Sequence, residues 1–264
     1  MTSKNLIKLF AFFVFLCGMA AGGEPYFVDP NSNAGHESYG WQIGGGVLVN
    51  QRPYKGIDPR VIGIPFIMYD RRDWSLKGTR FDYKLANDGP WAMKTLLRLN
   101  TDGYDSNDSS FLRGMSDRHI TLDAGLQFSY TQKWGIVSFE GLSDILGVND
   151  GQRLSLRYSK PLANPFGIKK LVAIPFVGAE WQSTSLNDYY YGVRPKEAIP
   201  GRPAYNASDD FNYFLGVTCN YRLNKKWSVF GMCNFKLLGE NIQNSPIVNK
   251  DYQNTFIGGL LYRF

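Results

Sequence analysis

Residues 254–264 read NTFIGGLLYRF, an alternating run that ends on an aromatic residue. Side chains of a β-strand point alternately to its two faces, so the apolar residues of this run share one face. The apolar face carries Phe256, Leu260, Tyr262 and Phe264. A last strand of this kind suits a membrane β-barrel, where it closes against the first strand and its apolar face touches lipid. The stretch therefore predicts an all-β fold, an antiparallel transmembrane β-barrel.

The opposite end of the sequence has the composition of a secretory signal peptide. Two lysines precede an apolar run over residues 9–16, and small residues follow it. The run is shorter than the ~20 residues that a membrane-spanning helix needs. We therefore expect a signal peptide over residues 1–21 and one barrel domain over residues 22–264. Cys17 leaves lipoprotein processing as an alternative, although the bulky residue before it fits that processing poorly.

The overall composition agrees with a barrel and argues against other classes. No later segment approaches ~18 consecutive apolar residues, so we expect no transmembrane helix. Aromatic residues make up 15% of the chain, with 16 Tyr and 18 Phe. That number can supply girdles at both membrane interfaces, although a soluble all-β sandwich can be equally aromatic. The net charge of +6 is a mild excess, and no basic cluster with interleaved aromatics points to nucleic acid.

Eleven segments separated by turn residues have the length and pattern of barrel strands. They are 39–50, 59–70, 78–87, 91–101, 119–131, 134–144, 151–161, 168–184, 211–223, 227–238 and 251–264. A bacterial barrel with both ends on one side needs an even number of strands. We therefore predict twelve strands, with ten as the alternative, and place the missing strand between residues 26 and 31 or within 185–207. Pro65 and Pro175 predict sheet edges, strand ends or bulges at their positions.

The lengths of the links give the expected orientation. Outer-membrane barrels have short periplasmic turns and long outer loops. Long links occur at 102–118, 145–150, 185–207 and 241–250. Short links occur near 87–90, 131–133, 162–167 and 224–226. The two sets alternate along the chain, as a barrel requires.

Two cysteines follow the signal peptide, Cys219 and Cys233. They flank a turn at residues 224–226, so their strands should pair, and alternation places both on the apolar face. An oxidising compartment allows a disulfide, but the bridge needs Cα atoms within about 7 Å. Two buried thiols are the alternative.

Several motifs together resemble the MipA/OmpV family (MltA-interacting protein) of Gram-negative outer-membrane proteins. The most specific is the tyrosine-rich run Asp188-Tyr189-Tyr190-Tyr191-Gly192-Val193, followed by Glu197-Ala198 and Arg202-Pro203-Ala204-Tyr205-Asn206-Ala207. The resemblance also includes LRGMSD at 112–117, SPIV at 245–248 and the terminal YRF at 262–264. It extends from the glycines at 44–46 to Phe264, and residues 71–110 match least clearly.

The resemblance implies a barrel in the outer membrane. We expect no cofactor, and neither the spacing of the cysteines nor the histidines suggest a metal site. The member that gives the family its name is thought to link a lytic transglycosylase to a peptidoglycan synthase. The implied partners are therefore outer-membrane lipid and lipopolysaccharide, the barrel-assembly machinery and peptidoglycan-processing proteins. The resemblance implies a scaffold for cell-envelope machinery, and a narrow pore for small solutes is the alternative.

The residues themselves suggest two candidate sites. Tyr189, Tyr190, Tyr191, Arg202 and Tyr205 form a candidate partner or ligand surface. If residues 189–191 are extended, the first and third tyrosine share a face opposite the second. Tyrosine also suits an interfacial girdle or a loop that plugs the barrel. The second candidate is a barrel-assembly signal at Tyr262 and Phe264.

An enzyme is the remote alternative. The chain has two histidines, His36 and His119, and the second follows Ser116 and Asp117 closely. A hydrolase would need the serine within hydrogen-bond reach of the imidazole. Residues 102–108 carry calcium-loop-like oxygen donors but lack the glutamate and helices of such a loop. We expect no catalytic activity, and a scaffold should have a lumen filled by inward side chains such as Arg157, Glu180, Gln182 and Arg222.

Overall fold

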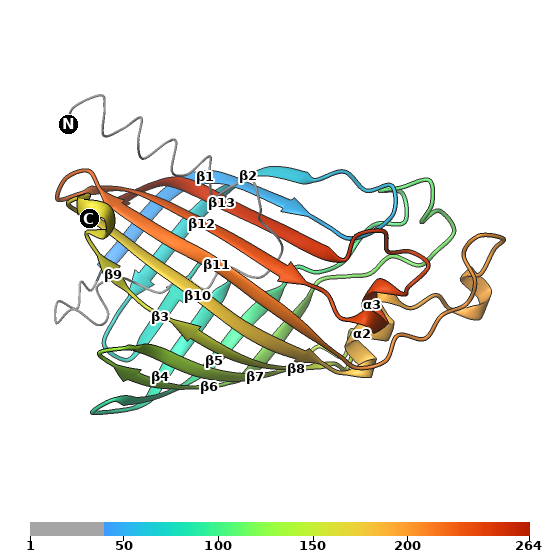
Figure 1. Ribbon diagram of the computed structural model, residues 1–264, viewed down its shortest axis with the longest axis horizontal. Helices are drawn as coiled ribbons and strands as arrows, with labels where there is room; N and C mark the ends of the chain where they lie inside the picture. The colour runs from blue at the N-terminus through green and yellow to red at the C-terminus, as the bar shows by residue number, and fades with distance from the viewer. Residues whose placement is uncertain (1–39) are drawn as a thin grey trace.

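A computed structural model describes residues 40–264 as one closed, antiparallel β-barrel (Figure 1). Apart from β9, each strand pairs with the next along the chain, so β10 pairs with both β8 and β11, and β1 closes the ring with β13. Twelve strands form the ring, as predicted; β9 is a two-residue addition beside β10. The strands are β1 (Gly40–Gln51), β2 (Arg60–Asp70), β3 (Trp74–Lys77), β4 (Arg80–Asp88), β5 (Trp91–Asn100), β6 (Thr121–Gln132), β7 (Gly135–Asp144), β8 (Gln152–Ser159), β9 (Leu162–Ala163), β10 (Leu171–Gln182), β11 (Asp210–Arg222), β12 (Trp227–Leu237) and β13 (Tyr252–Arg263).

The two ends of the barrel differ, as Figure 1 shows. One end, the loop end, carries the long links and the helices α2 (Thr184–Tyr191) and α3 (Glu240–Gln243), with a short 3-10 helix at Pro195–Glu197. The other end, the turn end, carries short links, a 3-10 turn at Pro165–Gly167 and Phe264. The alternation of long and short links predicted from the sequence is confirmed.

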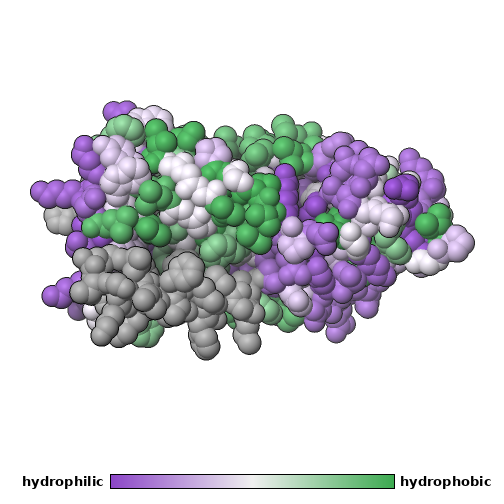
Figure 2. All heavy atoms as spheres, turned by 90° about the horizontal axis from the view of Figure 1, so that it is seen from above, coloured by the Kyte–Doolittle hydropathy of each residue, from purple (hydrophilic) through white to green (hydrophobic). Residues whose placement is uncertain are grey.

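Alternation along the strands separates the wall into two faces. In β8, Arg153 and Arg157 are buried in the lumen, whereas Leu154 and Leu156 are exposed on the outside. Figure 2 shows hydrophobic residues gathered over the barrel wall and hydrophilic residues over the loop end. Among residues 40–264 no helix combines the length and apolar character needed to cross a bilayer.

Aromatic rings form a belt around the turn end. Trp41 lies 4.6 Å from Tyr69, and Trp91 lies 4.4 Å from Tyr130, measured between ring centroids. Further contacts join Tyr69 to Trp74, Trp134 to Tyr158 and Trp227 to Tyr262. Amphipathic rings of this kind are enriched where a barrel meets the membrane interface.

The location predicted for the missing strand is wrong. The strand is β3, a four-residue segment before the expected strand 78–87, whereas residues 185–207 contain helix α2. Four residues are too short to show a period, so β3 left no signal in the sequence. Residues 26–31 and the predicted signal peptide lie outside the described part of the chain.

Cys219 and Cys233 are buried and form no disulfide with each other. Cys219 lies opposite Gly231, and Cys233 lies opposite Val217, so the cysteines are diagonal neighbours two positions apart. Diagonal Cα atoms are typically ~7–8 Å apart, which exceeds the usual reach of a disulfide.

Candidate functional site

The loop end is closed by a packed cluster of side chains, which we call the cap. Leu112, Ile242 and Ile247 are fully buried there, although they come from two separate loops. The Tyr54 ring lies 4.7 Å from Tyr104 and 5.7 Å from Tyr191 between centroids. Because these side chains are buried against one another, the loops pack together around a small hydrophobic core. Burial raises the pKa of Tyr104 to about 12, so its hydroxyl stays neutral.

The three consecutive tyrosines lie on helix α2, so the prediction that they alternate as a strand is wrong. Tyr190 and Tyr191 are buried in the cap, and Tyr189 packs against its edge. The Tyr54 hydroxyl donates to the Tyr190 carbonyl at 3.3 Å, and the Tyr189 hydroxyl accepts from the His119 N–H at 2.9 Å. The tyrosine run thus plugs the barrel mouth, one of the two structural roles considered for it.

Buried charges tie the cap loops together. Glu197 accepts from the Ser116 N–H at 2.9 Å and from the Arg118 guanidinium at 3.1 Å. Arg202 donates to carbonyl groups of Glu197 and Phe111. Burial raises the pKa of Glu197, but these hydrogen bonds outweigh it and lower the pKa to about 2. The glutamate is therefore ionised at neutral pH and holds the loops at residues 116–118 and 194–202.

The residues predicted to form a partner surface have unequal access. Arg202 is 1% exposed, and Tyr190 and Tyr191 are 1% and 5% exposed. Tyr205 is partly buried and donates its hydroxyl hydrogen to the Asn241 carbonyl at 2.8 Å. In this arrangement only Tyr189 and Tyr205 could meet a partner at the surface, and that role stays a prediction. At the turn end, Tyr262 and Phe264 are ring neighbours at 5.1 Å, and their part in assembly also stays a prediction.

One side of the lumen, the charged wall formed mainly by β4 to β8 and β10, carries a network of ion pairs. Arg80 donates to Asp82 and Glu140, both at 2.6 Å. Arg153 bonds Asp102 at 2.6 Å, and Lys236 on β12 bonds Glu180 at 2.8 Å. Burial raises the pKa of Asp102, but Arg153 and Lys236 lower it further, with a net decrease. The inward positions of Arg157, Glu180 and Gln182 are as predicted, whereas Arg222 is exposed at the turn end.

The opposite side of the lumen, formed by β12, β13, β1 and β2, carries an apolar layer. Its core is an edge-to-face contact between Phe66 and Phe230, with centroids 5.0 Å apart. The layer consists of Phe66, Met68, Phe230, Met232, Ile257 and Leu261. The apolar layer separates two cavities: a chamber of about 500 Å³ on the loop-end side and a pocket of about 80 Å³ at the turn end.

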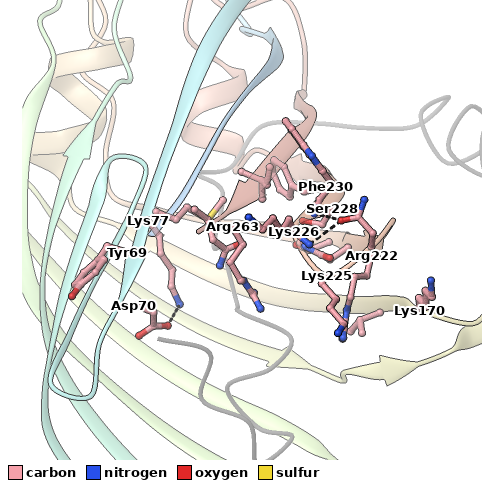
Figure 3. Close-up of a pocket in the computed structure, with 18 of the residues that line it drawn as sticks. Tyr69, Asp70, Lys77, Lys170, Arg222, Lys225, Lys226, Ser228, Phe230 and Arg263 are labelled. Atoms are coloured by element: carbon pink, nitrogen blue, oxygen red, sulfur yellow. Dashed lines mark hydrogen bonds and ion pairs between the residues drawn. The ribbon is translucent and has the colours of Figure 1, made fainter. Parts of the chain in front are cut away.

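The turn-end pocket is strongly basic, and Figure 3 shows its side chains. Its only acid is Asp70, which is bound to Lys77 at 3.3 Å. The other cations have no ion-pair partner among residues 40–264, and we call them the basic rim. They are Lys170, Arg222, Lys225, Lys226 and Arg263. Lys226 donates to the Tyr262 hydroxyl at 2.9 Å, and this hydrogen bond raises the pKa of Lys226. The sequence did not reveal this site, because Lys170 and Arg263 join the cations of residues 222–226 only in the folded barrel.

The candidate catalytic and calcium-binding residues have other partners. Ser116 Oγ accepts from Arg194 at 3.3 Å, and Asp117 accepts from the Ser106 N–H at 2.7 Å. Across the described residues no hydrogen bond joins His119 to either side chain. Asp108 in the supposed calcium loop bonds Arg52 at 2.8 Å. In residues 40–264 no cluster of three metal-ligating side chains occurs, and His36 lies outside this range.

A closed barrel with an apolar exterior, an aromatic belt and a charged lumen is an integral outer-membrane protein. The loop end then faces outward and the turn end faces the periplasm. The family model described as MltA-interacting protein MipA matches residues 43–264, and the chain belongs to this family.

Related proteins agree with this assignment. The chain is 27% identical to the MltA-interacting protein of Escherichia coli K12, over 89% of this chain and 94% of that protein. It is 35% identical to the outer membrane protein OmpV of Vibrio cholerae, over 64% of this chain and 65% of that protein. The NanC porin structure is similar to 84% of this chain over its whole length, with 8% identity and a TM-score of 0.47.

Proposed function

We propose that this barrel is a scaffold that holds a peptidoglycan-processing protein at its periplasmic end. The observation that supports the proposal most is the basic rim, five cations without an ion-pair partner in the described residues at the end that faces the periplasm. Such a cluster attracts an acidic surface through space, strongly at low salt and weakly at high salt. A relative that covers 89% of the chain is named for its interaction with MltA.

The filled lumen supports the same proposal. The cap fills the outer mouth, and the ion pairs and the apolar layer fill opposite sides of the lumen, which favours a structural role over free diffusion through the barrel. An interaction protein needs no open passage, because its binding groups lie at the rims.

The test is a pulldown from detergent-solubilised envelopes with the double variant Lys170→Glu/Lys225→Glu. Both side chains are exposed, so the barrel should fold normally. We expect recovery of periplasmic partners to fall about tenfold, and wild-type recovery to decrease as salt rises. The matched control is Lys196→Glu, which reverses an exposed charge at the outer end. Equal recovery by the rim variant and the wild type would remove the basic rim from the proposal.

A narrow pore is the second candidate, and the chamber of about 500 Å³ is the observation that favours it. Planar-bilayer recording separates the two candidates. A scaffold should give no steady single-channel conductance, whereas a pore should conduct without any substitution.

A barrel hydrolase is the remote candidate. If the protein is not a hydrolase, His119→Ala should leave every measured activity unchanged.

A further inference from the structure

The chamber between the cap and the apolar layer is a cavity that the proposed scaffold role does not use. Tyr54 and Tyr191 of the cap border it on the outer side, and Phe66 and Ile257 border it on the other. Its volume of about 500 Å³ lies within the usual range of small-molecule sites, roughly 300–1,000 Å³. The cap and the apolar layer enclose the chamber at its two ends, so a ligand needs another route into it.

The barrel wall has a gap beside the chamber. β2 pairs with β1 from Arg60 to Asp70, but it pairs with β3 only from Met68 to Asp70. The chain turns back at residues 78–79, where the Gly78 N–H bonds the Ile67 carbonyl at 3.1 Å. Between Arg60 and Phe66, no strand of the described residues pairs with this edge of β2. Above the turn, β2 and the end of β5 are therefore not joined by a ladder.

The chamber extends into this gap. Its lining includes Phe176 and Phe214 from inside the lumen and also Pro65 and Ile67. The Ile67 side chain is 44% exposed on the outer face of β2, and Pro65 is exposed on the same face. The lining thus reaches the unpaired edge of β2 and the turn at residues 78–79, which favours a sideways opening of the chamber at the gap.

The position of Pro65 fits an edge that is meant to stay open. Peptide groups of alternate residues in a strand point to the same neighbour. Since the Ile67 carbonyl points toward the β3 side, the peptide groups of Val61, Gly63 and Pro65 do so as well. Proline has no N–H to pair and is confined to such edges. The N–H groups of Val61 and Gly63 face the gap, and unpaired N–H groups at membrane depth favour a polar ligand group there.

The lining of the chamber combines an apolar side with a positive side. Ile62, Ile64 and Phe66 on β2 form the apolar side. The lining includes six cations and two carboxylates, and both carboxylates already bond Arg153 or Lys236. Arg52 and Arg98 bond carboxylates behind the lining, and Arg60 lies exposed beside the gap. Arg60 favours a negative group, while the apolar side favours a hydrocarbon chain.

We propose that the chamber binds an amphipathic anion, a single hydrocarbon chain with a carboxylate or phosphate head, which enters from the outer leaflet between β2 and β5. The chain packs against Ile62 and Ile64, and the head lies near Arg60 and the free N–H groups of β2. The site is independent of the basic rim and of the scaffold role.

The test uses the processed protein in a neutral maltoside detergent, with ligand binding measured by native mass spectrometry. Three probes share a twelve-carbon chain: laurate, lauroyl lysophosphatidic acid and the uncharged dodecanol. We expect one bound molecule of laurate or lysophosphatidic acid, and dodecanol binding at least tenfold weaker. The two anions distinguish a free fatty acid from a phosphate lipid as the source, and saturable binding of either supports the proposal. Failure of both anions to bind, or equal binding of dodecanol, would overturn it.

Matched substitutions locate the site. Ile62→Trp fills the chamber and should weaken laurate binding at least tenfold, whereas Val177→Trp, on the lipid face of β10 and away from the gap, should leave it unchanged. Arg60→Gln should weaken binding several-fold, and Arg263→Gln at the turn end should not. Heat-modified gel mobility and circular dichroism establish that each variant is folded. If both tryptophan variants bind laurate equally well, the ligand is not in the chamber and the proposal fails.

Discussion

The two sides of the lumen are filled by different kinds of side chain, one by ion pairs and the other by apolar groups. The charged wall fills its share with ion pairs such as Arg80–Glu140, and the apolar layer fills its share with rings such as Phe66 and Phe230. A buried charge is tolerated only when it is paired, whereas a buried ring needs only close neighbours. The charged wall should therefore be intolerant of single changes, and the apolar layer should control what passes through the lumen.

The largest effect is expected from Glu140→Gln in the charged wall. Glu140 bonds Arg80 at 2.6 Å and lies 3.5 Å from Arg98, so its neutralisation leaves two buried guanidinium groups without that charge. We expect the free energy of unfolding to fall by about 3–5 kcal/mol, the usual effect of breaking a buried pair. Denaturant unfolding in lipid vesicles measures it, and Glu240→Gln, exposed on α3, is the control. A loss below about 1 kcal/mol would contradict the contrast between the two sides.

A somewhat smaller loss of stability is expected from Phe230→Ala in the apolar layer. The ring is 3% exposed and packs against Phe66, so its removal should cost about 3 kcal/mol. Because the layer separates the chamber from the basic pocket, the variant should also join these two cavities, while the cap still closes the outer end. Phe211→Ala, on the outer face of β11, should do neither. Denaturant unfolding in lipid vesicles measures the loss, and a loss below about 1 kcal/mol would contradict the close packing of the layer.

The smallest effect is expected in the cap, where Glu197 pairs a buried charge within an apolar cluster. Its pKa is lowered from 4.5 to about 2, so its contribution to stability is complete above pH 4.5. The contribution decreases as the pH falls from 4.5 toward 2, where the carboxylate is protonated. Proteolysis of the loops at residues 194–202 should therefore increase over that range, with an acid-stable protease as the probe. Glu197→Gln should be cleaved at the same rate at pH 6 and pH 3.

The sequence predicted the barrel correctly because the evidence for strands is local. Alternation in residues 119–131 and 151–161 can be read from neighbouring residues, and link lengths gave the orientation of the ends. The family resemblance rested on the loop around 188–205, and the family match confirms it. The candidate site was predicted less well, because the tyrosine run was interpreted as extended and forms helix α2.

By itself, therefore, the sequence determined which segments cross the membrane, which face of each strand meets lipid and which family the chain belongs to. These features depend on period and motif, which neighbouring residues encode. Only the tertiary structure decided that Arg153 meets Asp102, that Tyr54 packs on Tyr191 and that β3 turns back early enough to leave a gap in the wall. Each of these depends on the register of strands far apart in the chain, and no local pattern records that register.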